Sequence, residues 1–146
     1  MGKRRKAREA AIQYHFWRDL QHGEMPDRIE DFWEFCPATT KVREFAQPLI
    51  EGMVSHLQDV DERIKRYCEN YEFNRISPVD RNILRLAIYE MLFRDDIPPV
   101  VSINEAIELA KTFGGADSGR FVNGILDRVK SDLTRPLREA APPREP

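Results

Sequence analysis

Residues 77–129 read SPVDRNILRLAIYEMLFRDDIPPVVSINEAIELAKTFGGADSGRFVNGILDRV, and this stretch contains the start signals of two helices. Ser77 is a typical N-cap, and Pro78 suits the first helical position because its φ is already helical and its missing N–H costs nothing there. Ser102 and Glu105 have the spacing of a capping box, directly ahead of an apolar helical pattern. The stretch therefore predicts one helix that begins at Pro78 and another that begins at Ser102.

Helical spacing continues along the whole chain, because apolar residues recur every three or four positions and alternation is nowhere sustained. Gly114 is expected to end the helix from Ser102, since a left-handed residue costs little only for glycine. The predicted fold class is all-α, with about seven helices in two packed small helical bundles and the helix from Pro78 buried between them. The helices are expected near residues 3–20, 28–35, 40–54, 60–71, 78–94, 102–113 and 118–133, with Pro48 kinking the third or marking a restart.

The end of the chain is rich in proline, with four prolines after Thr134. Such a segment has few apolar side chains to pack. We expect one domain over residues 1–133 and a proline-rich disordered tail over residues 134–146.

Length and composition favour a cytoplasmic protein. A chain of 146 residues can bury roughly 70% of its unfolded surface and so needs no disulfide or metal to fold. Cys36 and Cys68 form no disulfide framework. No apolar run reaches the length of a membrane span, and the first residues lack the apolar core of a signal peptide, so no membrane partner is expected.

Charge is distributed unevenly along the chain. The net charge of −2 and the pI of about 6.0 argue against a protein that coats nucleic acid indiscriminately. However, five cationic residues precede the first acidic residue, and we call residues 3–8 the basic segment. On a helical wheel with Arg4 at zero, Arg8 lies at about 40°, His15 at about 20° and Arg18 at about −40°. The pattern predicts a cationic stripe that faces water while the aromatic residues of the same helix face the core.

Two features of this first helix leave alternatives open. Glu9 and Gln13 fall inside the predicted apolar arc, so either the helix projects beyond the core there or these groups are paired beneath the surface. The basic segment is either a solvated, frayed end or a grip for phosphates. In the second case about four contacts to single-stranded RNA would give a salt slope near −2.8.

The sequence contains no recognisable active site, and we expect a protein that is not an enzyme. Its three histidines are scattered without metal-ligand spacing, and no nucleophile motif is present. Gly114, Gly115 and Gly119 follow no strand, so they do not make a dinucleotide or phosphate loop. No metal and no cofactor are expected.

Four segments together resemble the NusB family of transcription antitermination factors. They are KAREAAIQ (6–13), SPVDRNILRLAIYEM (77–91), INEAIELAKTFG (103–114) and SGRFVNGILD (118–127). The resemblance extends from about Arg5 to Val129 and implies an all-α fold of two bundles. It also implies binding of the boxA sequence of nascent RNA together with ribosomal protein NusE, in an RNA polymerase elongation complex with other Nus factors. Relatives with this module can self-associate, so a homodimer is compatible with the resemblance.

The same resemblance implies two sets of site residues. The partner-binding set comprises Asp80 and exposed neighbours on its helix such as Glu90. Members of the family often have tyrosine at the position of Phe16, so a hydrogen bond from that hydroxyl is missing here unless Tyr14 or His15 compensates. The RNA-binding set comprises Lys3, Arg4, Arg5, Arg8, Gln13, Phe16, Phe113, Asp117, Arg120 and Phe121.

Other interpretations of these residues remain. Taken alone, Asp117 or Ser118 is most simply an N-cap, and Phe121 a core residue. The chain could be a NusB-like accessory domain of an RNA methyltransferase, although it contains no glycine-rich cofactor loop. It could also be a purely protein-binding helical scaffold, in which case the basic segment is incidental.

Overall fold

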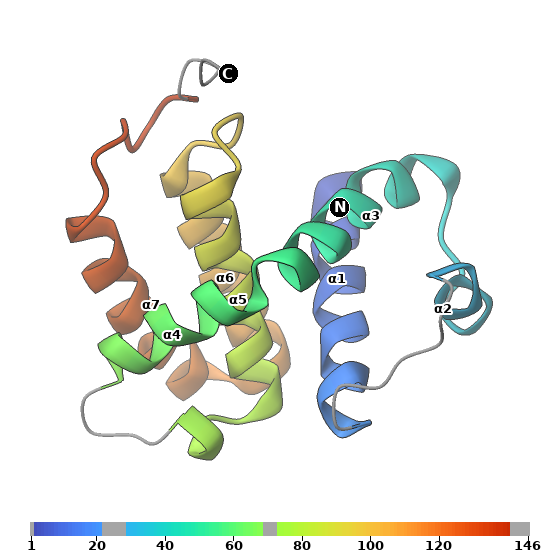
Figure 1. Ribbon diagram of the computed structural model, residues 1–146, viewed down its shortest axis with the longest axis horizontal. Coiled ribbons are helices and arrows are strands. Elements are labelled where there is room, and N and C mark those ends of the chain that lie inside the picture. The colour runs from blue at the N-terminus through green and yellow to red at the C-terminus, as the bar shows by residue number, and fades with distance from the viewer. Residues whose placement is uncertain (1, 22–28, 69–72, 141–146) are drawn as a thin grey trace. The chain divides into compact units, whose positions relative to one another are not determined.

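The computed structural model describes residues 2–21, 29–68 and 73–140, and within these ranges the chain is helical without strands. It divides into two compact units, residues 1–55 and 56–146, which we call the N-terminal unit and the C-terminal unit (Figure 1). The prediction of an all-α fold with about seven helices in two bundles is confirmed. The elements of the described ranges are α1 (Lys3–Leu20), α2 (Ile29–Phe35), α3 (Thr40–Ser55), α4 (Leu57–Tyr67), the 3-10 turn η1 (Phe73–Arg75), α5 (Pro78–Phe93), α6 (Pro99–Gly114) and α7 (Ala116–Ser131).

Two predicted helix ends fall outside the described residues, namely the start of the second helix at residue 28 and the end of the fourth at residue 71. The third helix, α3, runs through Pro48 from Thr40 to Ser55, so of the two predicted alternatives, a kink or a restart at Pro48, the structure excludes the restart. Pro48 is exposed, whereas Leu49 and Ile50 beside it are buried. Packing of these apolar residues holds the helix together across the missing backbone donor.

The N-terminal unit is built by α1 packing on α3, with α2 alongside. Aromatic rings of α1 and α2 meet edge to face, with Tyr14 and Phe32 at 5.2 Å between centroids and Trp17 and Phe32 at 5.8 Å. Phe32 itself is 1% exposed. Such edge-to-face pairs add to the free energy gained from burying the rings.

The buried face of α1 differs from the predicted one, because it includes part of the predicted water-facing stripe. Ala11 and His15 are fully buried and Arg8 is 5% exposed, whereas Leu20 and Gln13 are exposed. The predicted water-facing stripe is therefore wrong at Arg8 and His15. Within the predicted apolar arc, Gln13 is exposed, whereas Tyr14 and Trp17 contact Phe32 of α2.

The physical reason for this difference is the small size of the residues that face α3. Ala7, Ala11 and Ala46 are fully buried, and α1 packs more extensively on α3 than on any other helix. Side chains this small allow two helices to approach closely. The imidazole of His15 then lies against α3, with its Nε2 3.3 Å from the carbonyl oxygen of Ile50.

The C-terminal unit is organised around α5, which packs against α4, α6 and α7. Every residue of α5 from Asn82 to Met91 is buried. The helix starts as predicted, with Pro78 at its first position and the Ser77 Oγ accepting a hydrogen bond from the Asp80 amide at 3.2 Å. A helix buried all round in this way needs its polar residues to be paired inside the unit.

The capping box predicted for α6 is wrong. The helix begins at Pro99, three residues before Ser102, because proline fits the first helical turn and Pro98 supplies the extended residue ahead of it. Ser102 therefore lies within the helix, where its Oγ donates a hydrogen bond to Glu90 Oε1 at 2.8 Å.

The turn between α6 and α7 also differs from the prediction. Gly114 is still helical, and the residue with positive φ is Gly115. Gly115 is also the residue that precedes α7, so neither Asp117 nor Ser118 is its N-cap. Two glycines in succession made the position of the left-handed residue ambiguous from the sequence.

We expect Gly115→Ala to lower the free energy of unfolding by about 1–3 kcal/mol, measured by urea denaturation. Gly115 has φ +88° and ψ −174°, a backbone conformation that is confined almost entirely to glycine. A Cβ there would meet nothing within 4 Å, so the loss would come from the backbone alone. Gly124→Ala is the matched control, because Gly124 is helical with equally open space and alanine should leave stability unchanged or raise it by up to about 1 kcal/mol. Equal stability changes in the two variants would contradict this account.

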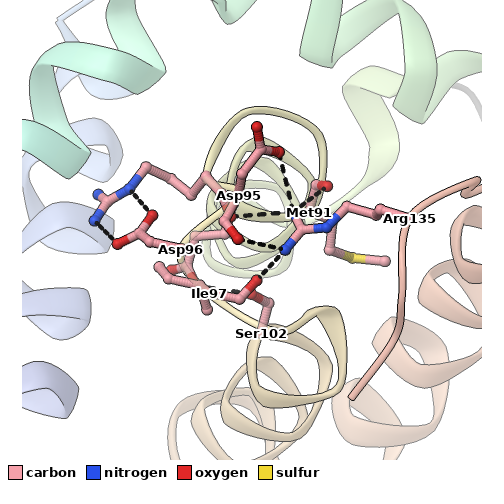
Figure 2. Close-up of polar contacts among 8 residues, drawn as sticks. Met91, Asp95, Asp96, Ile97, Ser102 and Arg135 are labelled. Atoms are coloured by element: carbon pink, nitrogen blue, oxygen red, sulfur yellow. Dashed lines mark hydrogen bonds and ion pairs between the residues drawn. The ribbon is translucent and has the colours of Figure 1, made fainter. Parts of the chain in front are cut away.

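The segment after α7 is attached to the turn between α5 and α6 by Arg135 (Figure 2). Its guanidinium donates hydrogen bonds to the carbonyl oxygens of Met91 and Arg94, both at 3.0 Å, and to that of Asp95 at 3.3 Å. It also donates to the carbonyl of Ile97. The carbonyl of Leu137 in turn accepts a hydrogen bond from the Val100 amide at 2.9 Å. Arg135 and Leu137 fall within the predicted disordered tail, and in the structure both have defined partners.

Candidate nucleic-acid interface

The basic segment forms the first turns of α1. Lys3 and Arg4 are exposed and Arg5 is partly exposed, and the first turn contains no acidic residue. Positive charges at a helix N-terminus oppose the helix dipole, which attracts anions there. A cluster of cations at this position therefore weakens the isolated helix, and a bound anion such as a phosphate would relieve the repulsion.

Arg4 is partly positioned within the N-terminal unit. Its guanidinium carbon lies 5.0 Å from the centroid of the Phe45 ring of α3. A cation over an aromatic ring is attracted by the electrons of its face, so Arg4 is restrained while its side chain stays exposed. Arg8, one turn later, is buried, so an RNA contact through its side chain is not available in this structure.

The outward face of α1 contains two more of the predicted residues. Gln13 is exposed and Phe16 is partly exposed. They lie three residues apart, so both are on one side of the helix. An amide and an aromatic ring in this arrangement could hydrogen-bond and stack on an unpaired base.

The turn between α6 and α7 brings together the other four predicted RNA-binding residues. The Phe113 ring is 52% exposed, an unusual position for a large apolar side chain. Asp117 and Arg120 are both exposed and form an ion pair one helical turn apart. Phe121 is partly buried beside them. The C-terminal unit thus presents an exposed ring, a carboxylate and a guanidinium on one turn, which suits stacking on bases and hydrogen bonding to their edges.

The two residues predicted to bind a protein partner lie deeper than expected. Glu90 is 1% exposed, so its predicted exposure is wrong. The reason is that α5 is surrounded by other helices, and Glu90 accepts its hydrogen bond from Ser102 inside the unit. Asp80 is half-buried and accepts a hydrogen bond from Ser118 Oγ at 3.2 Å.

The sequence reasoning missed a buried ion pair that organises the C-terminal unit. Arg85 donates from Nε to Asp61 Oδ1 at 2.7 Å and from Nη2 to Asp61 Oδ2 at 3.0 Å. Its Nη1 donates to Asn82 Oδ1 at 2.9 Å. The available signal was a charged residue within an otherwise apolar stretch of the helix, LRLAIY, which is unusual unless that charge is paired.

The described residues do not point to an active site. Within the ranges that the structure describes, no three His, Cys, Asp or Glu side chains gather so as to hold a metal ion. Burial raises the pKa of both the Cys36 and Cys68 thiols, which disfavours the nucleophilic thiolate. None of the helices in the described part of the chain is long and apolar enough to span a membrane.

Comparisons with known proteins show what this chain is similar to. Residues 5–131 match the NusB family. Transcription antitermination protein NusB of Geobacter sulfurreducens is 46% identical over 134 residues, which cover 91% of this chain and 97% of that protein. The solved structure of T. maritima NusB has 42% identity and a TM-score of 0.78, covering 88% of this chain and 91% of that one. A chain in a crystal structure of antitermination factors NusB and NusE in complex with dsRNA has 27% identity and a TM-score of 0.79, covering 91% and 99%.

Proposed function

Since this chain belongs to the NusB family, we propose that it is a transcription antitermination factor that binds the boxA sequence of nascent RNA together with ribosomal protein NusE. The similar chain in the complex of NusB, NusE and dsRNA supports both kinds of partner. The boxA sequence follows from the family resemblance. We place the protein in the cytoplasm, acting without catalysis in the RNA polymerase elongation complex.

The observation that carries the RNA-binding proposal is the basic segment at the start of α1. Lys3, Arg4 and Arg5 are concentrated where the helix dipole already attracts anions, and the first turn of α1 contains no acidic residue. A chain with a net charge of −2 gains nothing in solubility from this cluster. Binding to the phosphates of RNA gives the cluster a role, because cations attract and bind the RNA backbone whatever its sequence.

Sequence preference must come from other residues, because phosphate contacts are the same for every sequence. The exposed Phe113 ring and the polar pair of Asp117 and Arg120 are the candidates in the C-terminal unit. Unpaired bases stack on aromatic rings, and each such contact typically contributes about 1–3 kcal/mol. The proposal therefore separates a holding surface on α1 from a base-reading surface on the turn between α6 and α7.

The combined variant Lys3→Ala, Arg4→Ala and Arg5→Ala tests the holding surface. Each lost contact to single-stranded RNA should flatten the slope of log affinity against log salt by about 0.7, so the three together should flatten it by about 2. When salt is raised from 50 to 200 mM, the fold loss of affinity should therefore be roughly twenty times smaller for the variant than for the native protein. Labelled boxA and scrambled RNAs, titrated at both salt concentrations with and without NusE, measure the effect, which should be equal for the two RNAs.

A variant with the same change of charge elsewhere is the control. Lys41→Ala, Arg66→Ala and Lys130→Ala together remove three exposed cations from α3, α4 and α7. This variant should keep the salt slope of the native protein. An unchanged slope in the basic-segment variant would refute the phosphate-binding role of α1. Binding to NusE without binding to any RNA at low salt would instead favour the protein-binding scaffold.

A further inference from the structure

Three helices of the C-terminal unit meet at Gly114, the last residue of α6. A Cβ placed on Gly114 would lie 2.2 Å from the Oγ and 2.6 Å from the Cβ of Ser118 in α7. It would also lie 3.4 Å from Oδ1 of Asp80 in α5. Only a residue without a side chain therefore allows the Ser118 hydroxyl to occupy this place. From there the hydroxyl donates its hydrogen bond to Asp80 Oδ2 at 3.2 Å.

The Asp80 carboxylate is directed into this junction. The backbone of Asp80 is fixed in the first turn of α5 by the hydrogen bond from its amide to Ser77 Oγ. Its Oδ2 accepts from Ser118, and its Oδ1 is buried and has no hydrogen-bond partner among the residues that the structure describes. The hydrogen bond from Ser118 is itself partly buried, and a hydrogen bond away from bulk water is electrostatically stronger than one at the surface.

The residues around this junction are the candidate base-reading residues. Phe113 directly precedes Gly114, and Asp117 directly precedes Ser118. Arg120 follows within the same turn of α7 and pairs with Asp117. A rotation of the first turn of α7 would move both partners of this pair relative to Phe113. Gly115, which follows Gly114, has no side chain that could restrain the turn.

We propose that Asp80 is a positioning residue, which sets the orientation of the turn between α6 and α7 for RNA through its hydrogen bond with Ser118. The inference rests on the proposed function, because it assigns a role toward the same RNA. Asp80 acts from inside the unit and touches no RNA. The affinity for RNA depends on the fraction of molecules whose turn is correctly oriented, and this fraction falls when the hydrogen bond is lost.

Four single variants test this role. Ser118→Ala and Asp80→Ala each remove one partner, and each should weaken boxA binding about fivefold to tenfold, the size expected from the net contribution of one ordinary hydrogen bond. The double variant should be no weaker than either single one, because both remove the same interaction. Asp80→Asn retains an acceptor oxygen and should restore most of the affinity. Gly114→Ala should weaken binding as Ser118→Ala does, because it displaces the hydroxyl, although alanine suits a helix better than glycine.

Hydrogen exchange of the free variants provides a readout that needs no RNA. The amides of residues 119–121, the first in α7 that can form helical hydrogen bonds, should exchange faster in Ser118→Ala, Asp80→Ala and Gly114→Ala, and at the native rate in Asp80→Asn. The salt slope of RNA binding should stay native in all four, because no phosphate contact is lost. Binding of NusE should be unchanged in Ser118→Ala.

The outcomes separate this inference from the proposed function. If the native chain prefers boxA RNA and Ser118→Ala binds it with native affinity, the positioning role is refuted and the proposed function stands. If Asp80→Ala loses NusE binding while Ser118→Ala retains affinity for RNA, Asp80 is a partner contact instead. If the native chain binds no RNA, the proposed function fails, and the positioning role fails with it even where the exchange rates change as expected.

Discussion

Arg85→Ala is expected to lower the free energy of unfolding by about 3–5 kcal/mol, the usual cost of removing one partner from a buried ion pair. The side chains of Arg85 and Asp61 are only 6% and 18% exposed. Without the guanidinium, the Asp61 carboxylate would keep a charge that water can reach only in part. The hydrogen bond from Arg85 to the Asn82 amide oxygen would be lost as well. Urea denaturation, with the slope of the transition compared between variants, measures the change.

Two further variants test the cause of this loss. The double variant Arg85→Ala and Asp61→Ala should recover part of the stability, because no charge then stays buried alone. Lys130→Ala is the surface control, since Lys130 and Asp127 form an ion pair at 3.6 Å with 44% and 57% exposed side chains. It should change stability by less than about 1 kcal/mol. A loss at Arg85 as small as that at Lys130 would mean that water screens the pair much better than its burial indicates.

Arg135→Ala is expected to destabilise the C-terminal unit by about 2–4 kcal/mol, because hydrogen bonds from a charged donor contribute about 1.5–3 kcal/mol each and are not additive. The Arg135 side chain is 10% exposed and donates to four main-chain carbonyls around the end of α5 (Figure 2). Its loss would leave these carbonyls short of donors at a place that water reaches poorly. Thermal and urea unfolding measure the stability of the variant.

The exchange rate of the Val100 amide locates this effect in the structure. Val100 donates to the carbonyl of Leu137, two residues beyond Arg135, so release of the segment should expose this amide. Arg135→Lys should recover less than half of the lost stability, because an ammonium lacks the planar fork that reaches several acceptors at once. Arg138→Ala is the control at an exposed position of the same segment and should leave both measurements unchanged. Native stability in Arg135→Ala would show that the segment contributes nothing to the fold.

Local signals placed most of the helices correctly. The start of α5 at Pro78 with Ser77 as its cap depends on atoms within three residues of each other, so the sequence alone was sufficient. The bounds of α1, Lys3–Leu20, are also those predicted from the sequence. The start of α6 was wrong because two local signals competed, and proline at position 99 prevailed over the serine at position 102.

The resemblance of four segments to one family identified the fold and the function class from the sequence, and the comparisons agree with both. It did not reveal which side chains are exposed. Arg8 and Glu90 were taken as surface residues, and both are buried. A motif fixes which residue occupies a position in the chain, whereas its exposure depends on helices that pack over it from elsewhere.

The amino-acid order by itself determined where the helices form, because capping, propensity and periodicity act over a few residues. Only the tertiary structure decided which faces the helices turn to each other and which charges they enclose. The contact of His15 with Ile50 spans 35 residues, that of Arg85 with Asp61 spans 24, and that of Ser118 with Asp80 spans 38. Such pairings depend on how closely small residues allow helices to approach, a property of two surfaces together that neither helix specifies alone.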